Sequence, residues 1–90
     1  MAFTTRKITI KDTDNVVILP DIKCKTVTLL AKSDNSGTVN FSPNAGTYSG
    51  TDHSFPLYAG KERFLEVDNA NQVSLKTAET TDQIVWVLIN

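Results

Sequence analysis

The 90-residue sequence has few of the residue types that build most catalytic and metal sites. Cys24 is its one cysteine and His53 its one histidine. No disulfide can form within the chain, and the usual zinc ligand set of several Cys and His residues cannot be built from one copy. Because Cys24 and His53 lie in different segments, they do not form an evident thiol and base pair. We interpret Cys24 as a small core residue.

A strong excess of one charge is also missing. Nine Lys and Arg residues oppose ten Asp and Glu residues, and the basic residues form no run longer than Arg6-Lys7. A nucleic-acid-binding domain normally carries a basic patch, so we expect no nucleic-acid partner. No apolar run approaches the ~20 residues of a membrane span, and residues 1–6 lack the features of a secretory signal. We therefore expect no membrane partner and synthesis in a cytosol.

Apolar residues at helical spacing are missing as well, whereas the alternation typical of β-strands recurs along the chain. Short apolar or alternating runs, separated by turn residues, occupy 5–11, 16–19, 22–31, 38–41, 55–58, 63–67, 72–77 and 84–90. The pattern predicts an all-β protein: a single-domain antiparallel β-sandwich or jelly roll of about eight short strands, covering residues 1–90. Residues 1–7 are a candidate N-terminal arm that contacts a partner.

The alternation also predicts which side chains share the core. They are Ile8, Ile10, Val27, Leu29, Val39, Phe41, Leu65, Val67, Val73 and Leu75. The apolar positions change from even numbers at Cys24 to odd numbers at Val27, which predicts a bulge or strand break near Lys25. Residues 33–37 have the composition of a hairpin loop.

The last run, residues 84–89, is apolar at six successive positions, so both faces of this strand are apolar. At ~1.5–3 kcal/mol per buried side chain, leaving three of them in water forgoes about 5–9 kcal/mol, which rivals the stability of a small domain. We expect one face to join the core and the other to be covered by a second layer or by another subunit. Val85, Val87 and Ile89 form the face that we consider for a subunit contact.

The chemical motifs in the sequence are incomplete. Asp12-Thr13-Asp14 begins like a calcium loop, but Val17 stands where the loop needs Gly and Lys23 where it needs Glu. Asp52-His53-Ser54 contains the residue types of a hydrolase triad, but sequence neighbours do not converge on one reacting atom. We therefore predict that the protein is not an enzyme and needs no metal and no cofactor.

The long irregular segment 42–54 has the composition of a functional loop. Tyr48 and Tyr58 could stack on a sugar, and a three-fold assembly would bring three copies of His53 together, although a loop histidine is usually only solvated. One alternative function is therefore a carbohydrate- or ligand-binding module, such as a fibre or tail-associated adhesion domain, that uses this loop.

From Lys25 onward the chain carries Thr-Val-Thr-Leu-Leu-Ala (26–31), Asp-Asn-Ser-Gly (34–37), Phe-Pro-Leu-Tyr-Ala-Gly (55–60), Glu-Val-Asp (66–68) and Ile-Val-Trp-Val-Leu (84–88). This order resembles small β-rich virion proteins of tailed bacteriophages, which include head decoration, or cement, proteins and small fibre or tail-associated domains. The resemblance covers about three-quarters of the chain. It implies a structural protein located in the virion, made in the host cytoplasm.

The same resemblance implies a symmetric homo-oligomer that contacts other virion proteins such as the major capsid protein. For an apolar face of the last strand that the chain does not cover itself, we favour a trimer. The expected function is stabilisation of a phage particle by a decoration subunit. The candidate partner or oligomer contacts are Phe3, Tyr48, His53, Tyr58, Val85, Val87 and Ile89.

Overall fold

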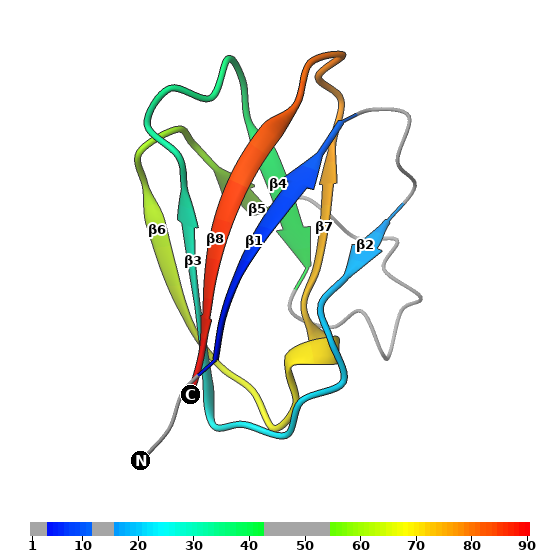
Figure 1. The fold of residues 1–90 in the computed structure, drawn as a ribbon, viewed down its shortest axis with the longest axis vertical. Coiled ribbons are helices and arrows are strands. Elements are labelled where there is room, and N and C mark those ends of the chain that lie inside the picture. The colour runs from blue at the N-terminus through cyan, green and yellow to red at the C-terminus, as the bar shows by residue number, and fades with distance from the viewer. Residues whose placement is uncertain (1–3, 12–15, 43–54) are drawn as a thin grey trace.

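The computed structural model describes residues 4–11, 16–42 and 55–90. Within these residues the chain is almost all β (Figure 1). The elements in chain order are β1 (Thr4–Ile10), β2 (Val17–Ile18), β3 (Thr26–Ala31), β4 (Val39–Ser42), β5 (Phe55–Leu57), β6 (Glu62–Glu66), the short 3-10 helix η1 (Ala70–Gln72), β7 (Ser74–Thr77) and β8 (Gln83–Ile89). The predicted all-β class is confirmed.

The strands form two antiparallel four-stranded sheets, in the orders β1-β8-β3-β6 and β2-β7-β4-β5. The pairs β1·β8, β2·β7, β3·β6 and β4·β5 are nested in the sequence, as if one long hairpin had been rolled up. The pairs β3·β8 and β4·β7 then complete the two sheets. This nested order is the topology of an eight-stranded jelly roll, so the structure selects the second of the two predicted architectures.

The core lies between the two sheets and contains the predicted residues. Ile10, Val27, Leu29, Val39, Phe41, Val73 and Leu75 are buried, and Ile8, Leu65 and Val67 are partly buried and pack against them. The alternation of apolar and polar residues therefore identified the inward face of each of these strands correctly.

The predicted irregularity near Lys25 is present. The backbone N–H groups of Lys25 and Thr26 both donate to the carbonyl oxygen of Asn90, at 2.9 and 3.1 Å. Two residues therefore face one on the neighbouring segment, which is the arrangement of a bulge. The extra residue moves the inward face from even to odd positions, and Val27 and Leu29 then point into the core.

The hairpin predicted for residues 33–37 is wrong, because β3 and β4 belong to different sheets. The Asn35 side chain accepts a hydrogen bond from the N–H of Ile84 and donates one to the carbonyl oxygen of Ile84, at 2.8 and 2.9 Å. These bonds attach the loop to the beginning of β8 instead of closing a hairpin. The chain then crosses to the second sheet.

The N-terminal arm also needs correction. Residues 4–7 belong to β1, where Thr4 pairs with Ile89 and Lys7 pairs with Trp86 in the antiparallel ladder. β1 is an edge strand, so its backbone groups on the side of β8 are paired within the domain. Residues 1–3, the rest of the proposed arm, lie outside the described residues. β2 is also shorter than the predicted strand 16–19 and forms one edge of its sheet.

Candidate functional site

The two faces of β8 have different surroundings. Val85, Val87 and Ile89 are buried against the second sheet, so the proposal that they contact a partner subunit is wrong. Successive side chains of a strand point to opposite faces, which places Ile84, Trp86 and Leu88 on the outer face of the β1-β8-β3-β6 sheet. The face of this sheet that carries Ile84, Trp86 and Leu88 is the candidate functional surface, and it is called the outer face below.

One row of side chains crosses the outer face from edge to edge. Trp86 of β8 is paired with Lys7 of β1 on one side and with Leu30 of β3 on the other, and Leu30 is paired with Glu62 of β6. Lys7, Trp86, Leu30 and Glu62 therefore stand side by side in this order. A basic group ends the row at β1 and an acidic group ends it at β6.

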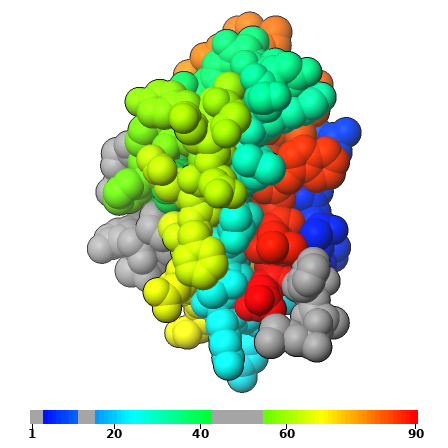
Figure 2. Space-filling model, turned by 90° about the vertical axis from the view of Figure 1, so that its left-hand side faces the viewer, coloured from blue at the N-terminus to red at the C-terminus, as the bar shows by residue number. Residues whose placement is uncertain are grey.

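The neighbouring row continues the apolar surface. Leu88 is paired with Thr5 on one side and with Thr28 on the other, and Thr28 is paired with Phe64 of β6. The short Thr28 side chain thus lies between two larger apolar ones. Both rows lie on the side of the molecule where β6, β3, β8 and β1 are adjacent (Figure 2).

The large apolar side chains of this face are unusually accessible. Phe64 is 66%, Trp86 44% and Leu30 40% exposed. Isolated exposed apolar residues are common on protein surfaces and need no explanation, but a contiguous apolar patch marks an interaction site. The register places these three side chains and Leu88 near one another on the face, so they form one patch. We therefore interpret the patch as an interaction site.

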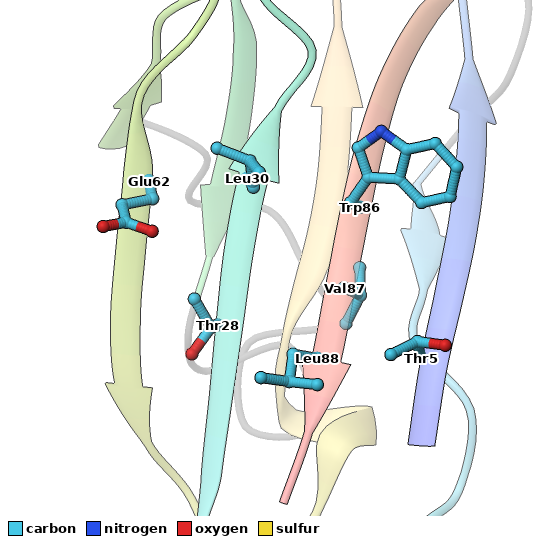
Figure 3. A pocket seen from close by; sticks show the side chains of 7 residues that line it. All are labelled: Thr5, Thr28, Leu30, Glu62, Trp86, Val87 and Leu88. Atoms are coloured by element: carbon cyan, nitrogen blue, oxygen red, sulfur yellow. The ribbon is translucent and has the colours of Figure 1, made fainter. Parts of the chain in front are cut away.

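The patch is hollowed between its side chains. Figure 3 shows the Trp86 ring extending toward β1 and the Leu30 side chain pointing toward β6, with Thr28 and Leu88 nearby. The hollow has a volume of about 250 Å³ and is lined by Thr5, Thr28, Leu30, Glu62, Trp86, Val87 and Leu88. A second hollow of about 280 Å³ adjoins the same Leu30 and Trp86 near Gly60.

The volumes of the two hollows suggest what kind of partner fits. Pockets for drug-sized ligands enclose about 300–1,000 Å³ and bury most of the ligand. Each hollow is smaller than this range and lies on the face of a sheet. A surface with shallow depressions between protruding apolar side chains fits the side chains of another protein better than a small molecule.

Electrostatics at the edge of the patch involve Lys7. Its Nζ lies 5.7 Å from the centroid of the Trp86 ring, within the range of a cation–π interaction. Among the residues that the structure describes, neither Lys7 nor Glu62 has an ion-pair partner in the chain. Both charges are therefore available to groups from outside.

The other predicted contact residues are placed as follows. Tyr58 is exposed and lies at the turn between β5 and β6, where its carbonyl oxygen accepts a hydrogen bond from the N–H of Lys61 at 2.9 Å. Gly60, in this turn, has a φ of 78°, a left-handed backbone conformation that glycine adopts without strain. Phe3, Tyr48 and His53 lie outside the described residues, as does the loop 42–54 except Ser42.

Cys24 is partly buried, and its Sγ donates a weak hydrogen bond to the carbonyl oxygen of Val67 at 3.7 Å. Burial, assisted by the negative charge of Asp68, raises the pKa of the Cys24 thiol. Both effects keep the thiol protonated and poorly nucleophilic. Among residues 4–11, 16–42 and 55–90, no three His, Cys, Asp or Glu side chains gather as a metal site would require.

Comparisons with known proteins do not assign a family. No family model matches the chain, and neither the curated proteins nor the solved structures contain a significant match. In the described part of the chain, no helix is long and apolar enough to cross a membrane. The functional interpretation therefore rests on the geometry of the outer face.

Sequence reasoning missed the residues that make up this face. The sequence analysis names none of Leu30, Phe64 and Trp86 as a contact residue. A signal was present for Leu30: it occupies the polar side of β3, in line with Thr26 and Thr28. An apolar residue on the polar side of an alternating strand indicates a contact outside the core.

Proposed function

We propose that this protein is a non-enzymatic structural subunit of a virion, of the decoration or cement type, and that it associates through its outer face. The observation that carries the proposal is the apolar patch of exposed Leu30, Phe64 and Trp86 with partly buried Leu88, on one sheet of the jelly roll. A partner that covers this patch removes apolar surface from water and thereby stabilises the assembly.

The dimensions of the face agree with a protein partner. β1 and β8 each contain seven residues, and the sheet has four strands. β3 and β6 are shorter, with six and five residues. With ~3.4 Å per residue and ~4.8 Å between strands, the sheet covers roughly 400 Å² in projection. This is about half of the ~800 Å² that each partner contributes to a standard interface, which is enough for a small, reversible protein contact.

The composition of the face has the arrangement of an interface core and rim. Trp86 and Leu30 lie on the central strands β8 and β3, whereas Thr5 and Lys7 lie on the edge strand β1 and Glu62 lies on the edge strand β6 beside Phe64. The eight-stranded jelly roll is also an architecture of viral capsid proteins, and this likeness agrees with the resemblance of the sequence to phage decoration proteins. The fold alone does not assign the function, so the proposal depends on the patch.

The proposal is tested by binding to phage heads. Purified parent protein and a Trp86→Asp variant are incubated with undecorated heads or with shells of the major capsid protein, and the pellets from sedimentation are quantified. We expect the parent to saturate the particles and to raise their resistance to heat. We expect Trp86→Asp to fold normally, because residue 86 points away from the core, and to lose at least ~tenfold in binding.

Lys76→Glu serves as the control, because Lys76 is exposed on β7 of the other sheet. This variant should bind like the parent. If the parent does not bind the particles, the decoration role is wrong. If Trp86→Asp binds as well as the parent, the outer face takes no part in the association.

A further inference from the structure

We infer that the outer face receives a second copy of this chain, packed face to face about a two-fold axis that runs parallel to the strands between β8 and β3. This inference rests on the proposed function and names the partner that covers the outer face. The pair then meets the phage head through its remaining surface, and Trp86→Asp weakens binding to heads because a single chain offers half of the contacts of a pair. The order of side chains in the row Lys7, Trp86, Leu30 and Glu62 carries it.

A two-fold rotation about this axis reverses the order of the strands in the second copy. The β1 edge of one copy then lies over the β6 edge of the other, so Lys7 meets Glu62 of the second copy and Glu62 meets its Lys7. Each contact occurs twice, because a two-fold interface uses the same surface on both subunits. Opposite charges therefore face each other at both edges.

The same rotation pairs the apolar side chains. Trp86 lies over Leu30 of the second copy, and Leu30 lies over its Trp86. In the next row Leu88 meets the short Thr28, which lines the hollow of about 250 Å³. The large leucine side chain therefore faces a short one across the interface. Sheets that pack in this way keep their strands within about 30° of each other and interdigitate across ~10 Å.

The other two-fold arrangement is unfavourable. An axis in the interface but perpendicular to the strands lays β1 over β1 and β6 over β6. If the axis passes through their row, Lys7 meets Lys7 of the second copy and Glu62 meets its Glu62; if it passes between this row and the next, Lys7 lies over Thr5 and Glu62 over Phe64, and neither charge meets its opposite. Like charges set against each other across an interface oppose association, so the charge order selects the axis parallel to the strands.

The sequence-based expectation was a trimer. A three-fold assembly joins two different surfaces of each subunit, whereas the outer face is complementary to itself. Its opposite charges stand at opposite ends of one row, and its large apolar side chains lie between them. The geometry of this face therefore points to a pair of chains, and the oligomeric mass distinguishes the two outcomes.

Two charge reversals test the pairing directly. We expect the parent to be a reversible dimer by sedimentation equilibrium. Lys7→Glu and Glu62→Lys, each alone, place like charges against each other at both edges, and each should weaken the dimer ~tenfold or more. An equimolar mixture of the two variants should recover dimers near the parent affinity, because one chain is then acidic at both edges and the other basic at both.

Lys76→Glu, on the opposite sheet, is the matched control and should dimerise like the parent. Lys7, Glu62 and Lys76 are all exposed, so the three variants are expected to fold, and circular dichroism checks this. A dimer that is unaffected by either reversal, or a mixture that does not recover, overturns the inference.

The orientation is tested by zero-length carbodiimide cross-linking of an equal mixture of isotope-labelled and unlabelled protein. We expect a cross-link between Lys7 and Glu62 that joins a labelled to an unlabelled chain. If the two chains are cross-linked at other residues and not between Lys7 and Glu62, the proposed axis is wrong. A cross-linked product or an oligomer with the mass of three chains also overturns it.

The inference and the proposed function fail separately. If the protein is a monomer but still binds phage heads through Trp86, the dimer is wrong and the decoration role stands. If the protein is a dimer that the charge reversals weaken, but it does not bind heads, the pairing stands and the decoration role is wrong.

Discussion

The two faces of β8 have the same apolar character in the sequence and opposite surroundings in the structure. Val85, Val87 and Ile89 are almost completely buried, whereas Trp86, between them, remains 44% exposed. The difference arises because the second sheet of the jelly roll covers only one face of the first. The apolar composition of a strand face therefore indicates that the face is removed from water. Only the fold shows which of the two faces is buried within the same chain.

The largest expected effect comes from placing a charge on the inner face. Val87 is 1% exposed, and Val87→Asp buries a carboxylate without a partner. We expect a loss of about 4 kcal/mol in the free energy of unfolding, which leaves much of the protein unfolded at room temperature. Urea denaturation followed by Trp86 fluorescence measures it.

Leu88→Asp, one position further on the outer face, is the comparison for that variant, since Leu88 is only partly buried. It should cost much less stability than Val87→Asp. Equal losses in the two variants would show that the faces do not differ as described.

A smaller loss is expected at the start of the inner face, where Gln83 is buried and hydrogen-bonded. Its Oε1 accepts a bond from the N–H of Gly37 at 3.0 Å, and its Nε2 donates to Ser36 Oγ at 2.9 Å. Gln83→Met keeps the length of the side chain but leaves the Gly37 N–H without this acceptor. We expect a loss of about 2 kcal/mol in thermal or urea unfolding.

Faster amide exchange at Gly37 should accompany this loss, because the N–H is released. Unchanged protection of that amide in Gln83→Met would contradict the role assigned to the glutamine side chain.

The smallest effect concerns the outer face within one chain. Lys7→Met removes the cation that lies 5.7 Å from the Trp86 ring centroid and keeps most of the aliphatic side chain. An exposed cation–π contact contributes about 0.5–1 kcal/mol, so the stability of the monomer should fall by no more than this. The emission of Trp86, the one tryptophan, should shift. An unshifted spectrum would show that the contact is not formed in solution.

The fold class and most of the core could be predicted from the sequence because period-two alternation records which side of a strand meets the second sheet. Ile10, Leu29 and Val73 are examples that the structure confirms. The shift of this pattern at Lys25 also predicted the bulge correctly. These features are determined by residues that are close together in the sequence, so a short stretch of the sequence is enough to predict them.

The connections and the site were less predictable because they depend on residues far apart in the chain. Residues 33–37 have a hairpin composition, but Asn35 and Gly37 bond to β8, more than forty residues later. The outer face likewise combines four strands, and no local pattern brings Lys7, Leu30 and Glu62 together. Val85, Val87 and Ile89 were proposed as contacts because the sequence does not tell the two faces of β8 apart.

The central claim is that the exposed face of β8 is an association surface while its buried face is core. It is tested most directly by light scattering of the parent and of Trp86→Asp across a range of concentrations. For a chain of 9.9 kDa, we expect the parent to reach twice this mass and the folded variant to remain at the mass of one chain. A parent protein that keeps the mass of a single chain at every concentration, or a variant that associates like the parent, would contradict the account.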